Sequence, residues 1–225
     1  MPEPVPPGRA DQDFWWSLGR ALIGPFMRLL FRFRVVGPGN LPAEGGGVLA
    51  SNHVSVFDPI FLGLLAAHRG RTVRFVGAAE NWRIPVIGWF LRRIRQIPIV
   101  RGGRDLAALE DAARIVRSGA LAGIYPEGRV GPGPLMRGRS GAARLALASG
   151  GPLIPVGIWG PNARWSKRGL SLRPPWRPVV AVCIGPPIPA EGDPESNEDV
   201  NALTDRLMAE IGRQVMAART IARHP

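Results

Sequence analysis

Two residues five positions apart, His53 and Asp58, form the pair in this sequence best suited to chemistry. They lie within residues 51–58, Ser-Asn-His-Val-Ser-Val-Phe-Asp, where a short apolar run gives way to a predicted helix. Histidine takes up and returns protons near neutral pH because its ordinary pKa is about 6.5. If the chain turns between the two residues, the carboxylate holds one ring nitrogen and the other faces a substrate hydroxyl, as a general base does. Each residue alone also fits a structural explanation, a satisfied core histidine and an aspartate that caps a helix.

A glycine-rich turn is the second candidate. Residues 123–133 read Gly-Ile-Tyr-Pro-Glu-Gly-Arg-Val-Gly-Pro-Gly and place one carboxylate, Glu127, beside Gly128 and Arg129. Backbone amides in such a turn, together with an arginine, are able to hold a phosphate group. Pro-Glu-Gly is also common turn chemistry, so a phosphate site and a purely structural turn both remain open.

The elements that must position these segments alternate between short apolar runs and helical patterns over residues 35–190. This alternation predicts strands at 47–51, 72–76, 97–100, 121–125, 153–159 and 179–184. Helices are predicted at 58–68, with Asp58 as the N-cap, at 106–116 and 140–149, and at the C-terminus over 197–220. The pattern indicates one α/β domain, with a mixed central sheet flanked by helices and a core over residues 35–190.

Residues 14–34 differ in character from the rest of the chain. Apolar residues recur at helical spacing, two tryptophans stand near the start, and the only charges are four arginines. We expect a basic amphipathic helix, broken near Gly24-Pro25, that associates with an anionic membrane surface. The alternative is a helix packed on the domain's own core. Residues 1–13, rich in proline, are expected to form a disordered tail.

The formal net charge is +12, and no carboxylate occurs between Gly128 and Ala190, a stretch that contains eight arginines. Such a charge points to nucleic acid, an anionic membrane or a phosphorylated substrate as partner. A non-enzymatic basic membrane- or nucleic-acid-binding protein would explain it. The aromatic residues, however, collect at the N-terminus instead of alternating with arginines, so we expect no nucleic-acid partner.

Other classes of site are not indicated. The longest uncharged run, 145–163, is interrupted by glycine and proline, so no transmembrane segment is predicted, and residues 1–13 have no apolar core of a signal peptide. The single cysteine, Cys183, excludes an internal disulfide. His68 and His224 lack partners at ligand spacing, so we expect no metal. We expect a peripheral protein at the cytoplasmic face of the cell membrane; the oligomeric state is left open.

Four blocks, in this order, resemble the lysophosphatidic acid acyltransferase family, which comprises 1-acylglycerol-3-phosphate acyltransferases and their glycerol-phosphate and lysophospholipid relatives. The first is Asn-His at 52–53 with an aspartate five residues after the histidine, and the third is Pro-Glu-Gly at 126–128. The second is Gln-Ile-Pro-Ile-Val-Arg-Gly at 96–102, and the fourth is Pro-Leu-Ile-Pro-Val-Gly at 152–157. A basic, glycine-containing helix start follows the third block.

The resemblance implies transfer of a fatty acyl chain from acyl-CoA or acyl carrier protein to the free hydroxyl of 1-acylglycerol-3-phosphate, giving phosphatidic acid. No cofactor is implied. His53 would deprotonate the acceptor hydroxyl, Asp58 would hold the imidazole, and the hydroxyl would attack the thioester directly. Arginines would bind the acceptor phosphate. The residues expected to bind substrates are Arg101, Glu127, Gly128, Arg129, Asn52 and Arg137.

One departure from the family lies in the third block, which commonly continues with threonine and then arginine. Here Arg129 follows Gly128 directly and Val130 stands in the arginine's place. The same order occurs in lysophospholipid-recycling members. Another lysophospholipid or glycerol 3-phosphate therefore remains open as the acceptor, and a hydrolase that uses the same histidine–aspartate pair on acyl-CoA is a further alternative.

Overall fold

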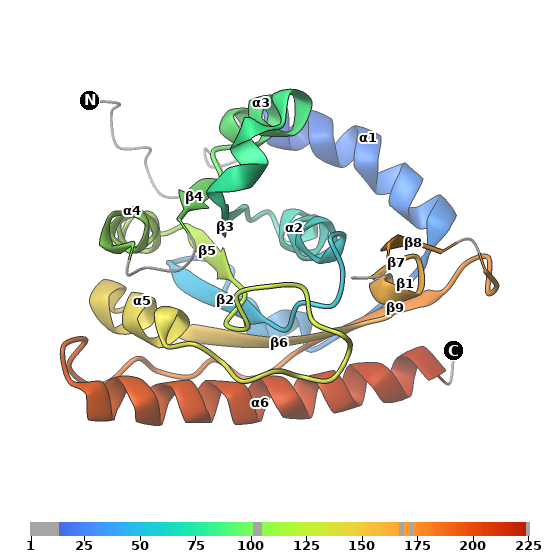
Figure 1. Cartoon of the computed structure of the whole chain (residues 1–225). Coiled ribbons are helices and arrows are strands. Elements are labelled where there is room, and N and C mark those ends of the chain that lie inside the picture. Colours follow the sequence, from blue (N-terminus) through green and yellow to red (C-terminus); the bar gives the residue numbers. More distant parts are fainter. Residues whose placement is uncertain (1–13, 101–104, 167–168, 172, 224–225) are drawn as a thin grey trace.

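Seven strands form one central sheet in the computed structural model, which describes residues 14–100, 105–166, 169–171 and 173–223 (Figure 1). The order across the sheet is β1-β9-β6-β2-β5-β3-β4. The strands are β1 Arg32–Val36, β2 Gly47–Ser51, β3 Val73–Ala78, β4 Ile97–Ile99, β5 Leu121–Ile124, β6 Leu153–Trp159 and β9 Val179–Ile184. A separate hairpin consists of β7, Trp165–Ser166, and β8, Gly169–Leu170.

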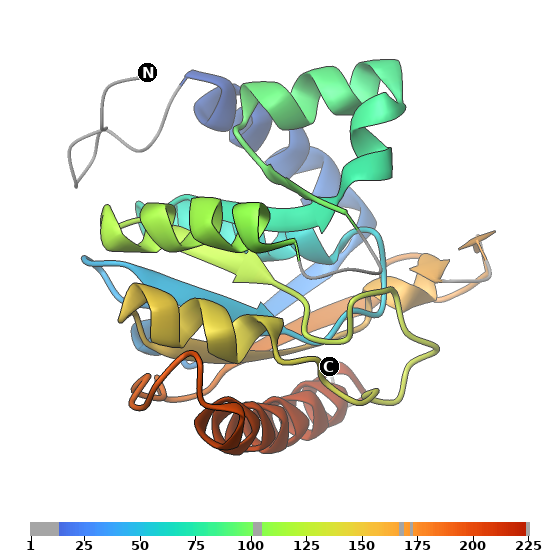
Figure 2. The same ribbon diagram turned by 60° about the vertical axis from the view of Figure 1, so that its left-hand side comes forward.

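Helices cover both faces of the sheet (Figures 1 and 2). One face carries α1, Phe14–Leu30, and α2, Asp58–His68, with α3, Pro85–Arg93, beyond them. The other face carries α4, Leu106–Arg117, α5, Gly141–Ser149, and the long α6, Asn197–Arg223. Short 3₁₀ turns occur at Pro38–Asn40, Ala79–Arg83 and Pro161–Ala163.

The sheet is mixed, as predicted. β6, β2, β5, β3 and β4 run parallel, whereas β9 is antiparallel to β6 and pairs in parallel with β1. Strand β2 is central, so every residue from Gly47 to Ser51 is buried. Parallel neighbours end at the same edge of a sheet. The residues that follow β2 therefore emerge beside those that follow β5, and the two candidate segments meet there.

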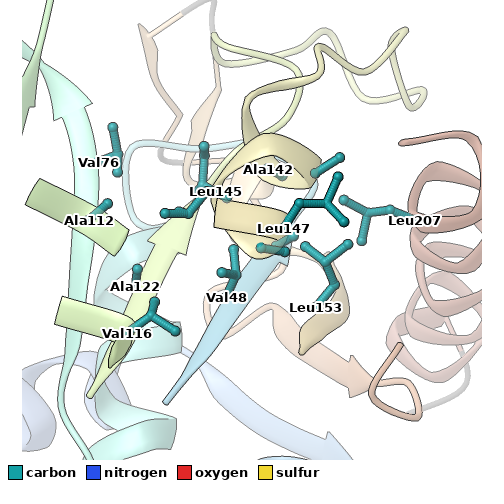
Figure 3. Close-up of a cluster of buried hydrophobic side chains, with 14 of the residues drawn as sticks. Val48, Val76, Ala112, Val116, Ala122, Ala142, Leu145, Leu147, Leu153 and Leu207 are labelled. Carbon is teal, nitrogen blue, oxygen red and sulfur yellow. The ribbon is translucent and has the colours of Figure 1, made fainter. Parts of the chain in front are cut away.

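Two apolar cores lie on opposite faces of the sheet. Figure 3 shows the first, in which Val48 and Ala122 of the sheet pack against Leu145 of α5 and Leu207 of α6. The second lies under α1 and α2 and includes Phe31. Helix α6 packs closely on β6 at Gly157, where a Cβ atom would lie only 2.1 Å from the carbonyl carbon of Gln214. Each face of the sheet thus has its own helical cover.

Several predicted elements are confirmed. The predicted strands 47–51, 153–159 and 179–184 match β2, β6 and β9 residue for residue. The predicted helix 58–68 also has the bounds of α2, and the other strands and the helices at 106–116, 140–149 and 197–220 differ from those observed by one to three terminal residues. The helix α3 and the turn Ala79–Arg83 before it were missed, because nine residues starting at a proline carry too short a periodic signal.

The prediction for residues 14–34 was wrong in two respects. Helix α1 is not broken at Pro25 but continues to Leu30, because Met27 is buried beyond the proline and fixes the last turn on the core. The chain then enters β1 at Arg32, so the predicted boundary at residue 34 divides a strand of the sheet. None of the helices that the structure describes combines the length and the hydropathy that a bilayer crossing needs.

Candidate active site

His53 and Asp58 are in direct contact. The His53 Nδ1 atom lies 2.9 Å from Asp58 Oδ2, and the same oxygen accepts hydrogen bonds from the backbone amides of Val54 at 2.7 Å and Ser55 at 2.8 Å. Because a carboxylate only accepts, Nδ1 carries the ring proton and Nε2 is the basic nitrogen. The His53 side chain is 16% exposed, whereas that of Asp58 is fully buried. The pair therefore has the geometry of a general base with its orienting carboxylate.

The predicted N-cap role of Asp58 was wrong. The N-cap position of α2 is Phe57, and Asp58 is the first helical residue. Its carboxylate points back to the preceding loop instead of forward to the helix amides, because three donors converge there and the next residue, Pro59, has no amide hydrogen. Asp58 thus closes the loop that carries His53.

Burial raises the pKa of the Asp58 carboxyl from its ordinary value, and the hydrogen bonds from His53, Ser55 and Val54 act against this. Tyr125, at the end of β5, stacks on the imidazole with ring centroids 4.0 Å apart and an interplanar angle of 16°. Burial, and secondarily the Asp58 charge, raises the pKa of Tyr125 well above 10, so the phenol is neutral. The imidazole is therefore fixed at its edge by Asp58 and on its face by Tyr125.

Glu127 joins the two candidate segments. Its Oε1 atom accepts a hydrogen bond from the His53 backbone amide at 2.7 Å, and Oε2 accepts one from the Met136 amide at 3.0 Å. The Gly131 amide in turn donates to the His53 carbonyl at 2.6 Å. Burial raises the pKa of Glu127, and both amide hydrogen bonds lower it. Both oxygens of its carboxylate accept from backbone amides, so Glu127 positions the loop that carries His53, and the expectation that Glu127 binds substrate stays a prediction.

Asn52, Arg137 and Arg101 are three further residues that the sequence predicts to bind substrates. The Asn52 amide donates to the Ile158 carbonyl at 3.0 Å and accepts from the Ile158 amide at 2.8 Å, so it ties the end of β2 to β6. Arg137 is exposed and does not line the cavity described next, because the turn from 131 to 138 carries it outward. Arg101 lies outside the described residues.

A large cavity of about 1100 Å³ opens beside His53. Its deeper part lies between α1, α2 and α3 and is mostly apolar. Trp16, Ile23, Leu64, Phe75, Trp82 and Phe90 are among its lining side chains. The other end is polar, with Gly128 and Arg129 of the predicted turn. His53 thus lines a cavity with an apolar part and a polar part, and the charged lining residues include Arg129 and Arg139 as well as the carboxylates of Asp105, Glu110 and Glu195.

Arg139 is a lining residue that sequence reasoning did not place in the site. Gly128 has a left-handed φ of 71°, and a Cβ there would lie 3.2 Å from Arg139 Nε, so the guanidinium crosses the turn at this glycine. The Arg139 backbone amide donates to the Pro126 carbonyl at 2.9 Å. Arg129 and Arg139 thus flank one turn. The only signal in the sequence was the basic helix start that follows the third block.

The fold, the histidine–aspartate pair and the two-ended cavity define the class, an α/β domain with a site of acyl-transfer type. The model of the Acyltransferase family matches residues 32–159, more than half of the chain, which therefore belongs to that family. The matched segment runs from β1 through β6 and includes both candidate segments.

Individual relatives agree with this assignment. An uncharacterized protein of Mycobacterium tuberculosis, Rv0502, is 32% identical over 165 residues, which are 67% of this chain and 43% of that protein. The 1-acyl-sn-glycerol-3-phosphate acyltransferase of Bacillus subtilis is 29% identical over 127 residues, 55% of this chain and 61% of that one. The chain spans less than half the length of the mycobacterial relatives it matches.

A solved structure has the same fold. The crystal structure of the 1-acyl-sn-glycerophosphate (LPA) acyltransferase PlsC from Thermotoga maritima superposes with a TM-score of 0.71 at 24% sequence identity, and the match covers 94% of this chain and 82% of that chain. Almost the whole chain therefore falls within the shared architecture.

Proposed function

We propose that the chain transfers a fatty acyl group from acyl-CoA, or from acyl carrier protein, to the free hydroxyl of 1-acylglycerol-3-phosphate and so forms phosphatidic acid. Membership in the Acyltransferase family supports this proposal, as does the similarity to the 1-acyl-sn-glycerol-3-phosphate acyltransferase of Bacillus subtilis. The observation that carries it is the position of the His53–Asp58 pair, between an apolar volume sized for an acyl chain and a turn flanked by two arginines.

The chemistry is a direct acyl transfer. His53 Nε2 takes the proton of the acceptor hydroxyl as the oxygen forms a bond to the thioester carbonyl carbon. The carbon–sulfur bond then breaks, and the imidazolium returns the proton to the leaving thiolate. Asp58 stabilises the transient positive charge through Nδ1, 2.9 Å away. A positioned general base contributes about 10² to 10⁴ in rate.

The two ends of the cavity suit the two parts of the substrates. A buried methylene group contributes roughly 0.8 kcal/mol, so the apolar end between α1, α2 and α3 favours the acyl chain. Guanidinium groups bind phosphate through paired, charge-assisted hydrogen bonds. Arg129 and Arg139, beside the backbone of Gly128, are therefore the proposed ligands of the acceptor phosphate, together with Arg101.

An assay with a panel of acceptors tests this function. The purified chain is incubated with palmitoyl-CoA and lysophosphatidic acid, other lysophospholipids or glycerol 3-phosphate, and products are read by mass. We expect phosphatidic acid as the main product and a loss of about 10² or more for His53→Ala in a folded protein. Release of free palmitate at the same rate without any acceptor would instead establish a hydrolase. Unchanged turnover in His53→Ala would overturn the mechanism.

Because the proposed acceptor is a lipid, we also propose that the chain docks peripherally on the cytoplasmic face of the membrane. Helix α1 exposes Phe14, Leu22, Phe26 and Leu29 by 55 to 70%. Helix α3, which contacts α1 through a Trp15–Trp89 ring pair, exposes large apolar side chains as well. Exposed apolar side chains on an arginine-bearing helix are typical of interfacial binding.

A further inference from the structure

Three parts of the chain that lack carboxylates meet at one end of the molecule. Residues 14–43, 128–190 and 211–225 contain no aspartate or glutamate. From them come the start of β1, the loop that leads into β9 and the last turn of α6, which together line a surface hollow of about 400 Å³. Figure 1 shows these elements together near the C-terminus. The charged residues that line the hollow are therefore all arginines.

Three arginines, one from each part, surround the hollow: Arg32, Arg177 and Arg223. All three are exposed, and none is in an ion pair with any carboxylate among the described residues. Arg177 donates a hydrogen bond to the carbonyl of Arg28 at 2.7 Å, which ties the loop to the end of α1. Guanidinium groups from three separate elements, without a neutralising carboxylate, form a surface suited to a phosphate group.

Apolar side chains project from the same end. Trp176 is 72% exposed and Leu170 60% exposed. The loop that presents Trp176 is held firmly, because the buried Arg164 guanidinium donates to the carbonyl of Arg173 at 2.8 Å and to that of Pro175. A large apolar side chain that is held out in water, although the core is close by, indicates a contact made outside the chain.

This end of the molecule is connected to the cavity. Trp165 of β7, 40% exposed, packs edge-to-face on Phe57 with ring centroids 5.8 Å apart. Phe57 lies directly before α2 and lines the cavity next to His53. A surface in contact with the β7–β8 hairpin would therefore border the path by which a lipid reaches the site.

We propose that this end, the loop surface formed by Arg32, Trp165, Leu170, Trp176, Arg177 and Arg223, is a second membrane contact that binds an anionic phospholipid bilayer. The three arginines hold a headgroup phosphate in the hollow, and Trp176 and Leu170 enter the interface. Tryptophan prefers headgroup depth, and each arginine near an anionic leaflet strengthens binding about fivefold. A second copy of the chain fits poorly, because two such surfaces repel each other. The inference rests on the proposed function, which requires a lipid acceptor.

The test measures binding of the full chain to vesicles of phosphatidylcholine with phosphatidylglycerol, without acyl donor or acceptor. We expect Arg223→Gln to raise the dissociation constant about fivefold and Trp176→Ser about tenfold, whereas Trp176→Phe stays near wild type. Arg206→Gln removes another exposed arginine of α6, outside the loop surface, and should have no effect. On pure phosphatidylcholine, Arg223→Gln should bind like wild type.

Two results would overturn the inference. One is a Trp176→Ser, Arg223→Gln double variant that is folded and binds anionic vesicles within twofold of wild type. The other is a lipid-free dimer that Trp176→Ser converts to monomer, which would make the loop surface an interface between copies. Neither depends on turnover, since no substrate is present. If the wild-type chain is inactive but binds vesicles, and the double variant no longer binds them, the proposed function fails while the membrane contact at the loop surface is supported.

Discussion

At the scale of single residues, the two oxygens of the Asp58 carboxylate differ in their contacts. Asp58 Oδ2 receives three donors, from His53, Val54 and Ser55, whereas Asp58 Oδ1 is buried without a hydrogen-bond partner among the described residues. The same oxygen therefore supplies the negative charge beside His53 and accepts the hydrogen bonds that hold the loop. A substitution that keeps an oxygen at this place but removes the charge distinguishes the two roles.

Asp58→Asn is that substitution. Its side-chain oxygen can occupy the place of Oδ2 and accept all three hydrogen bonds, while its NH₂ group takes the place of the unpartnered Oδ1. We expect kcat to fall about 10² to 10⁴-fold, because the imidazolium loses its counter-charge, with little change in Tm. Enzyme kinetics and thermal unfolding measure this. Asp58→Ala is the matched control and should also lower Tm, because it leaves two buried amides unsatisfied, at about 1–3 kcal/mol each. Equal activity in Asp58→Asn and wild type would show that the charge is not used.

Contacts between residues that are close in the sequence could be predicted, whereas contacts between distant residues could not. The contact between His53 and Asp58 was predictable because a five-residue loop before a helix brings the two together. The role of Asn52 was not, since its partner Ile158 is 106 residues away on β6. The same holds for Glu127, whose carboxylate bonds to the His53 amide 74 residues away. A motif identifies such residues as belonging to the site, but only the packed sheet shows whether they face substrate or backbone.

Among the elements, β1 and α3 were the hardest to predict. Central strands such as β2 are buried on both faces and therefore consist of short apolar runs, from which the first and last residues of the strands could be predicted. Strand β1 lies at the edge of the sheet with Arg32 and Arg34 exposed, and it continued the helical spacing of α1 without a turn signal. Helix α3 is short and begins at a proline. The elements that carry His53 and Glu127 were thus predictable, whereas α3, which lines the apolar part of the cavity, was not.

Helix α1 offers a test of that volume. Gly19 lines the cavity, and a Cβ there would lie 3.6 Å from the Phe90 ring, an ordinary contact. Gly19→Leu should therefore fill part of the apolar end and lower kcat/KM for palmitoyl-CoA relative to decanoyl-CoA by about tenfold or more, since each excluded methylene loses roughly 0.8 kcal/mol. Kinetics with a series of acyl-CoA lengths measure the shift.

Gly24→Leu is the control on the same helix. Its Cβ would lie 3.7 Å from Leu64, and Gly24 does not line the cavity. Both variants replace a helical glycine and should gain up to about 1 kcal/mol in helix propensity. Only Gly19→Leu should change the preference for chain length. The same change in both variants would assign the effect to helix stability, and no change in either would place the acyl chain elsewhere.

Across the whole molecule, charge is segregated along the chain and in space. The net charge is +12, and the carboxylates of the last third are confined to residues 191–210, whereas arginines extend to the end of α6. The exposed apolar side chains of α1, such as Leu22 and Leu29, belong to a part without acids. The folded chain therefore has two ways to bind an anionic membrane. Salt weakens the electrostatic attraction of the arginines, but it does not weaken the burial of the apolar side chains.

This combination predicts a partial dependence of membrane binding on salt. Raising the ionic strength from 0.1 M to 1 M shortens the Debye length from about 10 Å to about 3 Å, which removes most of the roughly 1 kcal/mol that each arginine contributes near an anionic leaflet. We expect the dissociation constant for vesicles containing phosphatidylglycerol to rise at least about tenfold, measured by flotation, while residual binding persists through Leu22, Leu29 and Val86. Binding to pure phosphatidylcholine should hardly change. Complete release at 1 M salt would mean that the apolar side chains of α1 and α3 do not enter the interface, and unchanged binding would mean that the arginines do not face it.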